Sequence, residues 1–179
     1  MDFTRYASLK DRTVVITGGA SGIGAAFVRA FAENGARVAF LDVQQEAGAA
    51  LVDALGPGAG KPLFIACDLT DIDALRAALD AVRTTLGPAT VLINNAASDQ
   101  RHDFATMSPA EFDHAIAVNF RHVFFAAQAI VPADARARPR FDRQHVFRLV
   151  DARYSVTRGL CLRQGRDCRL HQHARPSGR

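Results

Sequence analysis

The 179-residue sequence contains no tryptophan, two tyrosines, two methionines and three cysteines, and its only lysines are Lys10 and Lys61. Three cysteines cannot all pair with one another, and none share the C-x-x-C spacing, so we expect free thiols in a reducing compartment and no metal site. No run of about 18 apolar residues occurs, and the first ten residues lack the hydrophobic segment of a signal peptide. These absences predict a cytoplasmic protein without a membrane partner.

The charge balance changes abruptly at Pro132. Residues 1–132 carry 10 Lys and Arg against 14 Asp and Glu, a net charge of −4, whereas residues 133–179 carry 12 Arg against 4 Asp, a net charge of +8. The second part also contains no Lys, Glu, Ile, Asn, Met or Trp. Such a shift in composition marks a boundary. We predict a domain over residues 1–132 and an arginine-rich tail over residues 133–179.

Strand and helix patterns alternate along the first 132 residues. Short apolar or β-branched runs predict strands over 13–17, 37–42, 62–67 and 90–94. Helical spacing and capping residues, including Thr70 with Asp73, predict helices over 22–33, 44–55, 74–86 and 108–131. Strands joined by helices pair in parallel through right-handed crossovers. The sequence therefore predicts an α/β fold, the N-terminal half of a Rossmann-type doubly wound parallel sheet.

A glycine-rich loop, TGGASGIG over residues 17–24, joins the first predicted strand to the first predicted helix. Glycines there allow backbone N–H groups and the helix N-terminus to approach a pyrophosphate. Asp42 closes the second strand 18 residues after Gly24, where a carboxylate accepts hydrogen bonds from ribose and repels a 2′-phosphate, so NAD is favoured over NADP. A simple turn at the glycines, and a turn or cap role for Asp42, are the alternatives.

Together with the TGGASGIG loop and Asp42, three further motifs make residues 9–132 resemble the short-chain dehydrogenase/reductase family: Asp68-Leu69, Asn94-Asn95-Ala96-Ala97 and Ala117-Val118-Asn119. The usual N-N-A-G pattern is changed only by Ala97. This resemblance implies that NAD is held by ten residues: Gly18, Ser21, Gly22, Ile23, Gly24, Asp42, Asp68, Leu69, Asn95 and Ala96.

The resemblance also implies a catalytic role for Asn119, as the helix residue of the family's tetrad. Taken without the other motifs, an asparagine in a long amphipathic helix is an ordinary polar residue.

The loop over residues 98–102 (SDQRH) and the pair Arg121-His122 resemble the bacterial NAD-dependent sugar (D-xylose) 1-dehydrogenases. Those enzymes oxidise an aldose to its lactone, so the implied substrate is a small alcohol or sugar. Polar side chains at the carboxyl ends of strands are suited to bind several sugar hydroxyls. The alternative is that this loop is polar only because it is exposed.

Members of the family continue with a strand that ends in a catalytic Ser, followed by a Tyr-x-x-x-Lys helix. A phenol of pKa about 10 is a poor base at neutral pH unless a nearby cation stabilises the phenolate. The tyrosines of this sequence are Tyr6 and Tyr154, and Arg158 stands four residues after Tyr154. We therefore predict an oxidoreductase by descent whose chain, as given, has little or no activity. An NAD-binding pseudoenzyme and a non-functional fragment are the alternatives.

Reading degenerate codons one base later from residue 133 recovers the missing motifs. The shifted codons across 143–147 permit Val-Asn-Met-Ser-Ser, the one across Leu160 permits Tyr, and the one across Gln164 permits only Lys or Arg. The spacing between the serine, tyrosine and lysine codons then matches the family. A frameshift near codon 132, which leaves a truncated dehydrogenase, is the hypothesis that follows.

An out-of-frame tail has not been selected for burial, so we expect it to be largely disordered and the fourth strand to be an exposed sheet edge. The family forms homo-oligomers through its long helix, but their formation by a truncated chain is doubtful. Twelve arginines would bind phosphates without sequence preference, and we expect no specific nucleic-acid partner.

Overall fold

The structure is a computed structural model that describes residues 6–56 and 60–131 and the backbone of residues 145–148. All of them belong to one unit, residues 1–149. No helix among these residues is long and apolar enough to cross a membrane. The expected boundary at residue 132 stays a prediction.

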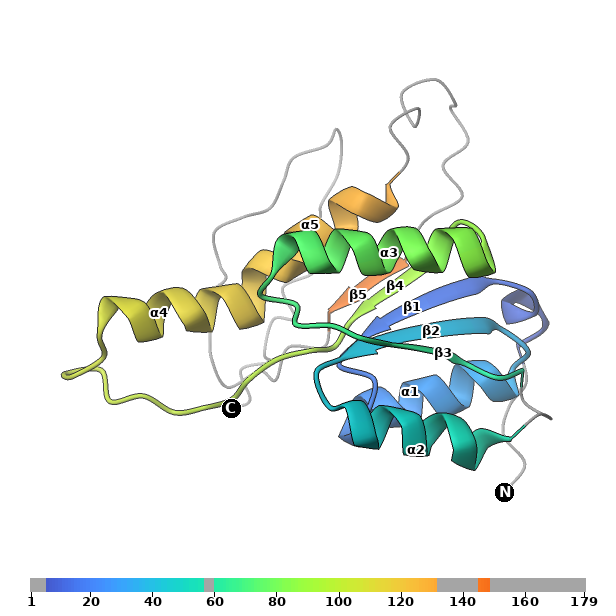
Figure 1. The fold of residues 1–179 in the computed structure, drawn as a ribbon, viewed down its shortest axis with the longest axis horizontal. Helices are drawn as coiled ribbons and strands as arrows, with labels where there is room; N and C mark the ends of the chain where they lie inside the picture. The colour runs from blue at the N-terminus through green and yellow to red at the C-terminus, as the bar shows by residue number, and fades with distance from the viewer. Residues whose placement is uncertain (1–5, 57–59, 132–144, 149–179) are drawn as a thin grey trace, which may run out of the picture. The chain divides into compact units, whose positions relative to one another are not determined.

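Five parallel strands form one sheet in the order β3-β2-β1-β4-β5 (Figure 1). The strands are β1 (Thr13–Thr17), β2 (Arg37–Asp42), β3 (Leu63–Ala66), β4 (Val91–Asn94) and β5 (His145–Arg148). In the register, Ile16 of β1 lies between Phe40 of β2 and Ile93 of β4. A strand order that reverses at β1 confirms the Rossmann-type parallel sheet expected from the sequence, and it places ligand sites at the carboxyl ends of the strands.

Helices cover both faces of the sheet (Figure 1). The face covered by α1 and α2 is opposite the face covered by α3 and α5. The helical elements are the 3-10 turn η1 (Ala7–Leu9), α1 (Gly22–Glu33), α2 (Gln45–Leu55), α3 (Ile72–Leu86), α4 (Pro109–Ile116), the π-helical segment η3 (Ala117–Arg121) and α5 (His122–Ile130).

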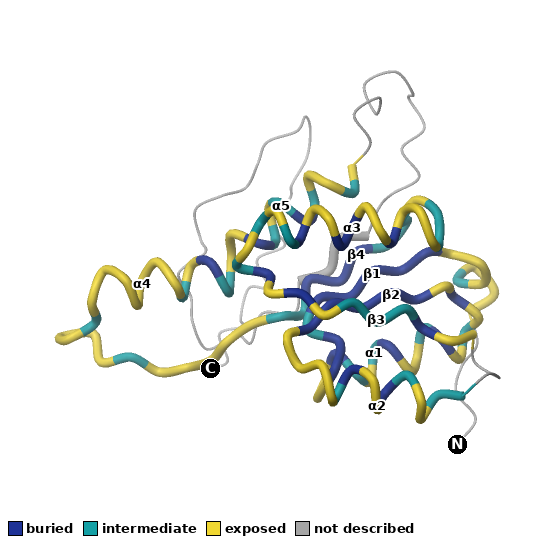
Figure 2. The backbone as a smooth tube through the Cα atoms, viewed as in Figure 1, coloured by how far each residue is buried: buried dark blue, intermediate teal, exposed yellow. Residues whose placement is uncertain are grey.

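The core divides into two layers because successive side chains of a strand point to opposite faces. In β1, Val14 and Ile16 pack with the residues of α1 and α2, whereas Val15 packs with those of α3 and α5. The inner strands are buried along almost their whole length (Figure 2). Burial on both faces explains why these strands are continuous apolar runs in the sequence.

The expected Thr70–Asp73 cap of the third helix is wrong. Asp71 is the N-cap, and its Oδ1 accepts hydrogen bonds from the N–H groups of Asp73 (2.9 Å) and Ala74 (3.0 Å). The hydroxyl of Thr70 instead donates to Asp68 at 2.7 Å. A carboxylate one residue closer to the helix therefore takes the capping position, and Thr70 belongs to the turn that precedes it.

The expected helix over 108–131 is interrupted. It begins with a capping box, in which the Ser108 hydroxyl accepts from the Glu111 N–H and the Glu111 carboxylate accepts from the Ser108 N–H. It then passes through the π-helical segment η3 before α5. A single π turn inserted in an α-helix is a frequent feature of functional sites.

The expectation that the fourth strand is an exposed edge is wrong. β5 pairs in parallel with β4 along all four residues, from Val91 with His145 to Asn94 with Arg148. An unpaired edge offers backbone donors and acceptors to any extended segment, whatever its side chains. Apart from β5, the predicted disorder of the tail falls outside the described residues.

Candidate cofactor site

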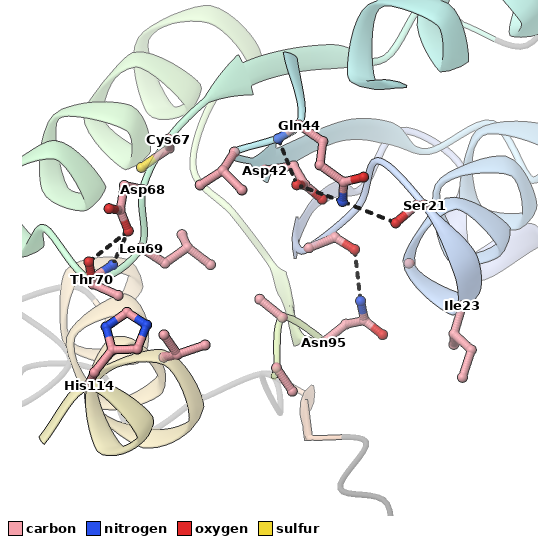
Figure 3. Close-up of a pocket in the computed structure, with 16 residues that line it drawn as sticks. Ser21, Ile23, Asp42, Gln44, Cys67, Asp68, Leu69, Thr70, Asn95 and His114 are labelled. Atoms are coloured by element: carbon pink, nitrogen blue, oxygen red, sulfur yellow. Dashed lines mark hydrogen bonds between the residues drawn. The ribbon is translucent and has the colours of Figure 1, made fainter. Parts of the chain in front are cut away.

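A cavity of about 530 Å³ opens at the carboxyl ends of β1 to β4 (Figure 3). Nine of the predicted site residues line it: Gly18, Ser21, Ile23, Gly24, Asp42, Asp68, Leu69, Asn95 and Ala96. Gly22 and Asn119 are not among the lining residues. The cavity volume is typical of small-molecule sites.

Two glycines allow the loop after β1 to fold tightly against the rest of the site. Gly18 has a φ of 66°, and a Cβ on it would lie 2.7 Å from the Cα of Ala96. A Cβ on Gly24 would overlap the carbonyl oxygen of Gly18. Any side chain at either position would therefore displace the loop.

The N-terminus of α1 faces this loop, and its N-cap residue leaves the first turn uncapped. Ser21 is the N-cap, yet its side chain makes no capping hydrogen bond. The first N–H groups of a helix have no partner within the helix, and the helix dipole gives this end a partial positive charge. Such an end is suited to bind a phosphate group.

Asp42, at the end of β2, is buried with 6% of its surface exposed. Its Oδ2 accepts a hydrogen bond from the Ala20 N–H at 2.9 Å, and its Oδ1 accepts one from the Gln44 N–H at 3.0 Å. The carboxylate therefore ties the glycine-rich loop to the end of β2. An ionised carboxylate has about four acceptor sites, so capacity remains for a hydroxyl in the cavity.

The side-chain amide of Gln44 extends this network across the wall of the cavity (Figure 3). Its Nε2 lies 3.2 Å from Ser21 Oγ and 3.4 Å from Asp42 Oδ1. Ser21 thus uses its hydroxyl as an acceptor for Gln44, which is consistent with the uncapped start of α1.

The loop after β4 is held by the end of β1. Thr17 is fully buried, and its Oγ1 accepts hydrogen bonds from the N–H groups of Asn95 (3.1 Å) and Ala96 (3.2 Å). The Asn95 side chain donates to the carbonyl of Gly18 at 2.8 Å. Two neighbouring strand ends are thereby joined at the centre of the cavity.

The opposite wall is formed by the turn after β3, with His114 beside it (Figure 3). Hydrogen bonds from the N–H (2.8 Å) and hydroxyl (2.7 Å) of Thr70 lower the pKa of Asp68, and the charge of His114 adds to this effect. The pKa of the Cys67 thiol is raised by burial and by the nearby Asp68 and Asp71 carboxylates.

Arg121 connects this turn to the π-helical segment. Its guanidinium donates to the Thr70 carbonyl at 2.8 Å, which joins residues 51 positions apart in the sequence. The segment that carries Asn119 is therefore linked to the wall that carries Asp68.

Asn119 lies in η3, and its side chain bridges the helix and the loop after β4. Its Nδ2 donates to the Ala115 carbonyl at 3.1 Å, and its Oδ1 accepts from the Ser98 N–H at 2.9 Å. In this position it can orient the loop over 98–102.

Seven lining residues were missed by the sequence analysis: Val43, Gln44, Cys67, Thr70, Ala97, His114 and Val118. Two features of the sequence could have indicated three of these residues. Gln44 follows the strand-ending Asp42 by two positions, and His114 and Val118 are spaced i, i+4 with Asn119 directly after them.

These residues fit a dinucleotide. The glycines let the loop after β1 fold tightly against its neighbours, and the uncapped start of α1 suits the pyrophosphate. Asp42 suits a ribose, and Leu69 with Val118 offers apolar surface for a base. Within the described ranges, no group of three or more His, Cys, Asp and Glu side chains is arranged to hold a metal ion.

Comparison with known proteins supports this interpretation. The family model described as "short chain dehydrogenase" matches residues 12–139. The "Probable galactose dehydrogenase GalD" of Rhizobium meliloti (strain 1021) is 45% identical over 130 residues, which are 72% of this chain and 51% of that protein. The "D-xylose 1-dehydrogenase" of Caulobacter vibrioides (strain NA1000 / CB15N) is 43% identical over 127 residues, 71% of this chain and 50% of that protein.

A solved structure, a blue fluorescent protein from a metagenomic library in complex with NADPH, superposes with a TM-score of 0.65 at 32% identity. The match covers 68% of this chain and 51% of that one. The chain thus spans about half the length of the curated relatives it matches.

Proposed function

Because the chain belongs to the short-chain dehydrogenase family, we propose that residues 12–131 form the NAD-binding part of an oxidoreductase that acts on a CH–OH group. The observation that carries this proposal is the joint geometry of the glycine-rich loop and the buried Asp42 carboxylate, which accepts the Ala20 N–H of that loop. This arrangement places the glycine-rich loop and the start of α1, which are suited to bind a phosphate, beside an acceptor suited to ribose.

The bound NAD would supply the hydride acceptor. Different residues of the chain would bind different parts of the dinucleotide or position the surrounding loops. Gly18, Gly24 and the start of α1 would hold the pyrophosphate, Asp42 would accept the adenosine ribose hydroxyls, and Asn95 would keep the loops in place through Gly18. Asn119 would orient the substrate loop through the Ser98 N–H.

We propose an aldose as the substrate, with oxidation of its anomeric C1–OH to the lactone. In that reaction the C1–H bond breaks as a hydride leaves, the C1–O bond becomes a carbonyl, and the hydroxyl proton passes to a base. The relatives carry galactose and D-xylose in their names, and the polar loop over 98–102 follows the carboxyl end of β4. The base is the part for which the sequence has no candidate at the position expected from the family, after Asn119. Lys10 stands four residues after Tyr6, but both precede β1, and the residue four positions after Tyr154 is Arg158.

A dinucleotide-binding protein without turnover is the second candidate. The sequence observation that favours it is that no Tyr-x-x-x-Lys pattern follows Asn119, since a phenol needs a nearby cation to act as a base at neutral pH.

Two measurements on the full 179-residue chain test these proposals. Titration calorimetry with NADH should show one site per chain, and turnover of D-xylose or D-galactose with NAD should remain at background. A matched protein, expressed from a gene read one base later from codon 133, should turn over the sugar. Absence of NADH binding would overturn the binding proposal, and turnover by the chain as given would overturn the assignment of the missing base.

A further inference from the structure

The side chain of Asn94 is buried at the carboxyl end of β4 with its hydrogen-bonding capacity unused. It is 2% exposed, and neither its Oδ1 nor its Nδ2 has a hydrogen-bond partner in the part of the chain that the structure describes. A buried amide in this state destabilises the fold, because both atoms have given up their hydrogen bonds to water. Such a group calls for a partner that packs against it.

The neighbouring strand on one side, β1, has no free group for this amide. Thr17 is paired with Asn94 in the sheet, so the two side chains lie on the same face. A threonine hydroxyl has one donor and two acceptor sites. All three are used, since Thr17 Oγ1 donates to the Ile93 carbonyl at 3.5 Å and accepts from the N–H groups of Asn95 and Ala96.

The helices that cover this face contribute apolar side chains to the core. Leu92 lies two residues before Asn94, hence on the same face, and it packs in a cluster with Leu75 of α3 and Ala126 of α5. His122 is the buried polar residue of α5, and Asn94 makes no hydrogen bond to it. The remaining neighbour of Asn94 is the strand on the other side of β4.

That strand, β5 at the edge of the sheet, is chemically mismatched with Asn94 (Figure 1). In the register, Arg148 is the residue opposite Asn94. A guanidinium has five donors and no acceptor, so an arginine cannot accept a hydrogen bond from Asn94 Nδ2 in any conformation. The family model matches residues 12–139, which include β4 but not β5. The edge of β4 is therefore shared with the family, whereas the strand beside it is not.

We propose that the edge of β4 is an acceptor site for a parallel, extended segment of another polypeptide, and that Asn94 selects a segment with a hydroxyl side chain opposite it. A hydroxyl accepts as well as donates, so it offers Asn94 Nδ2 the acceptor that arginine lacks. Backbone pairing gives such a segment its affinity, and the side chain facing Asn94 gives it selectivity. The segment takes the place of β5. This inference goes beyond the proposed oxidoreductase function and does not depend on NAD binding.

The test uses fluorescently labelled peptides of residues 142–151 that differ only at position 148. One peptide keeps Arg148, one carries Arg148→Thr and one carries Arg148→Val. Threonine and valine have nearly the same shape, so the valine peptide is the matched control for the hydroxyl. Dissociation constants are measured by fluorescence anisotropy for the 179-residue chain and for its Asn94→Leu variant. Circular dichroism melting reports whether that variant is folded.

The Arg148→Thr peptide should bind saturably, roughly five- to tenfold more tightly than the Arg148→Val peptide and more tightly than the Arg148 peptide, the effect of one hydrogen bond to a buried group. In the Asn94→Leu variant the advantage of threonine over valine should be lost, because leucine needs no partner. The same variant should melt at a higher temperature than the unaltered chain, since no buried amide is left unsatisfied.

Absence of saturable binding by the Arg148→Thr peptide would overturn the acceptor site. Equal affinities of the threonine and valine peptides would overturn the role of Asn94, and this is the result expected if an ordered water satisfies the amide or if the peptide adds to the outer edge of β5. A threonine preference that persists in the folded Asn94→Leu variant would overturn it as well.

A second measurement applies if the Asn94→Leu variant does not fold. Arg148→Thr and Arg148→Val are then compared within the 179-residue chain itself. The threonine variant should melt at the higher temperature, because its hydroxyl lies opposite Asn94 in the register. Equal melting temperatures of the two variants would contradict the selection by Asn94.

Discussion

The hydroxyl of Thr17 offers a direct test of how the cavity is held together. Thr17 is fully buried at the end of β1, and its Oγ1 is the acceptor for the N–H groups of Asn95 and Ala96. Thr17→Val preserves the shape of the side chain and removes this acceptor. Both N–H groups then lose their partner in the loop that forms the centre of the site.

The size of the effect follows from the burial of these groups. A buried donor left unsatisfied costs about 1–3 kcal/mol. Asn95 and Ala96 are half-buried, so the lower end applies to each, and we expect a loss of about 2 kcal/mol in the free energy of unfolding. Because domains have only about 5–15 kcal/mol of stability, this loss should lower the melting temperature by roughly 5 °C or more.

The same change should affect ligand binding, because Asn95 also donates to the Gly18 carbonyl of the glycine-rich loop. We expect the dissociation constant for NADH to rise by about tenfold, equivalent to 1.4 kcal/mol. Chemical denaturation measures the first effect, and titration calorimetry measures the second.

Thr13→Val is the matched control. Thr13 starts the same strand, is also buried, and uses its hydroxyl to donate to the Leu86 carbonyl at 2.9 Å, at the end of the sheet away from the cavity. Its loss should cost about 1 kcal/mol and leave NADH affinity unchanged. Equal effects of the two substitutions on NADH affinity, or none from Thr17→Val, would refute the reasoning.

Three further predictions concern other parts of the site. Gly24→Ala should weaken NADH binding by at least tenfold, since its Cβ overlaps the Gly18 carbonyl and overpacking costs about 1–3 kcal/mol; wild-type affinity in a folded variant would contradict this. Arg121→Ala should weaken 5′-AMP binding roughly threefold by releasing the Thr70 turn, measured by competition, whereas Arg83→Ala, which removes an exposed pair with Asp80, should not. Cys67 should react with iodoacetamide more slowly in the folded protein than in urea at pH 8, followed by peptide mass spectrometry, because its pKa is raised. Since folding holds the thiol proton more tightly, the contribution of Cys67 to stability should be complete below pH 8.5 or so and decline above it, and a Cys67→Ala variant should lack that decline.

Much of the fold could be predicted from patterns of apolar and polar residues. Strands such as β1 and β2 are buried on both faces, so they must be continuous apolar runs, and the helices between them must present one apolar face. The glycine-rich loop is also local, because Gly24 is required by contact with a residue only six positions earlier. For these reasons the sheet and its parallel connections were predicted correctly, and nine of the ten residues predicted to bind the cofactor line the cavity.

The remaining features depend on polar groups that compete for the same partners or on residues that are distant in the sequence. Whether Asp71 or Thr70 caps α3 was decided by the competing bond from Thr70 to Asp68, and the link from Arg121 to Thr70 spans 51 positions. The pairing of β5 with β4 is made by backbone N–H and C=O groups, which do not depend on side-chain identity. No side-chain pattern therefore predicted it. The spacing of apolar residues in the sequence indicates which face of a helix or strand is buried. The partner of a polar group is decided only in the tertiary structure, because packing of the elements brings competing donors and acceptors within hydrogen-bonding distance.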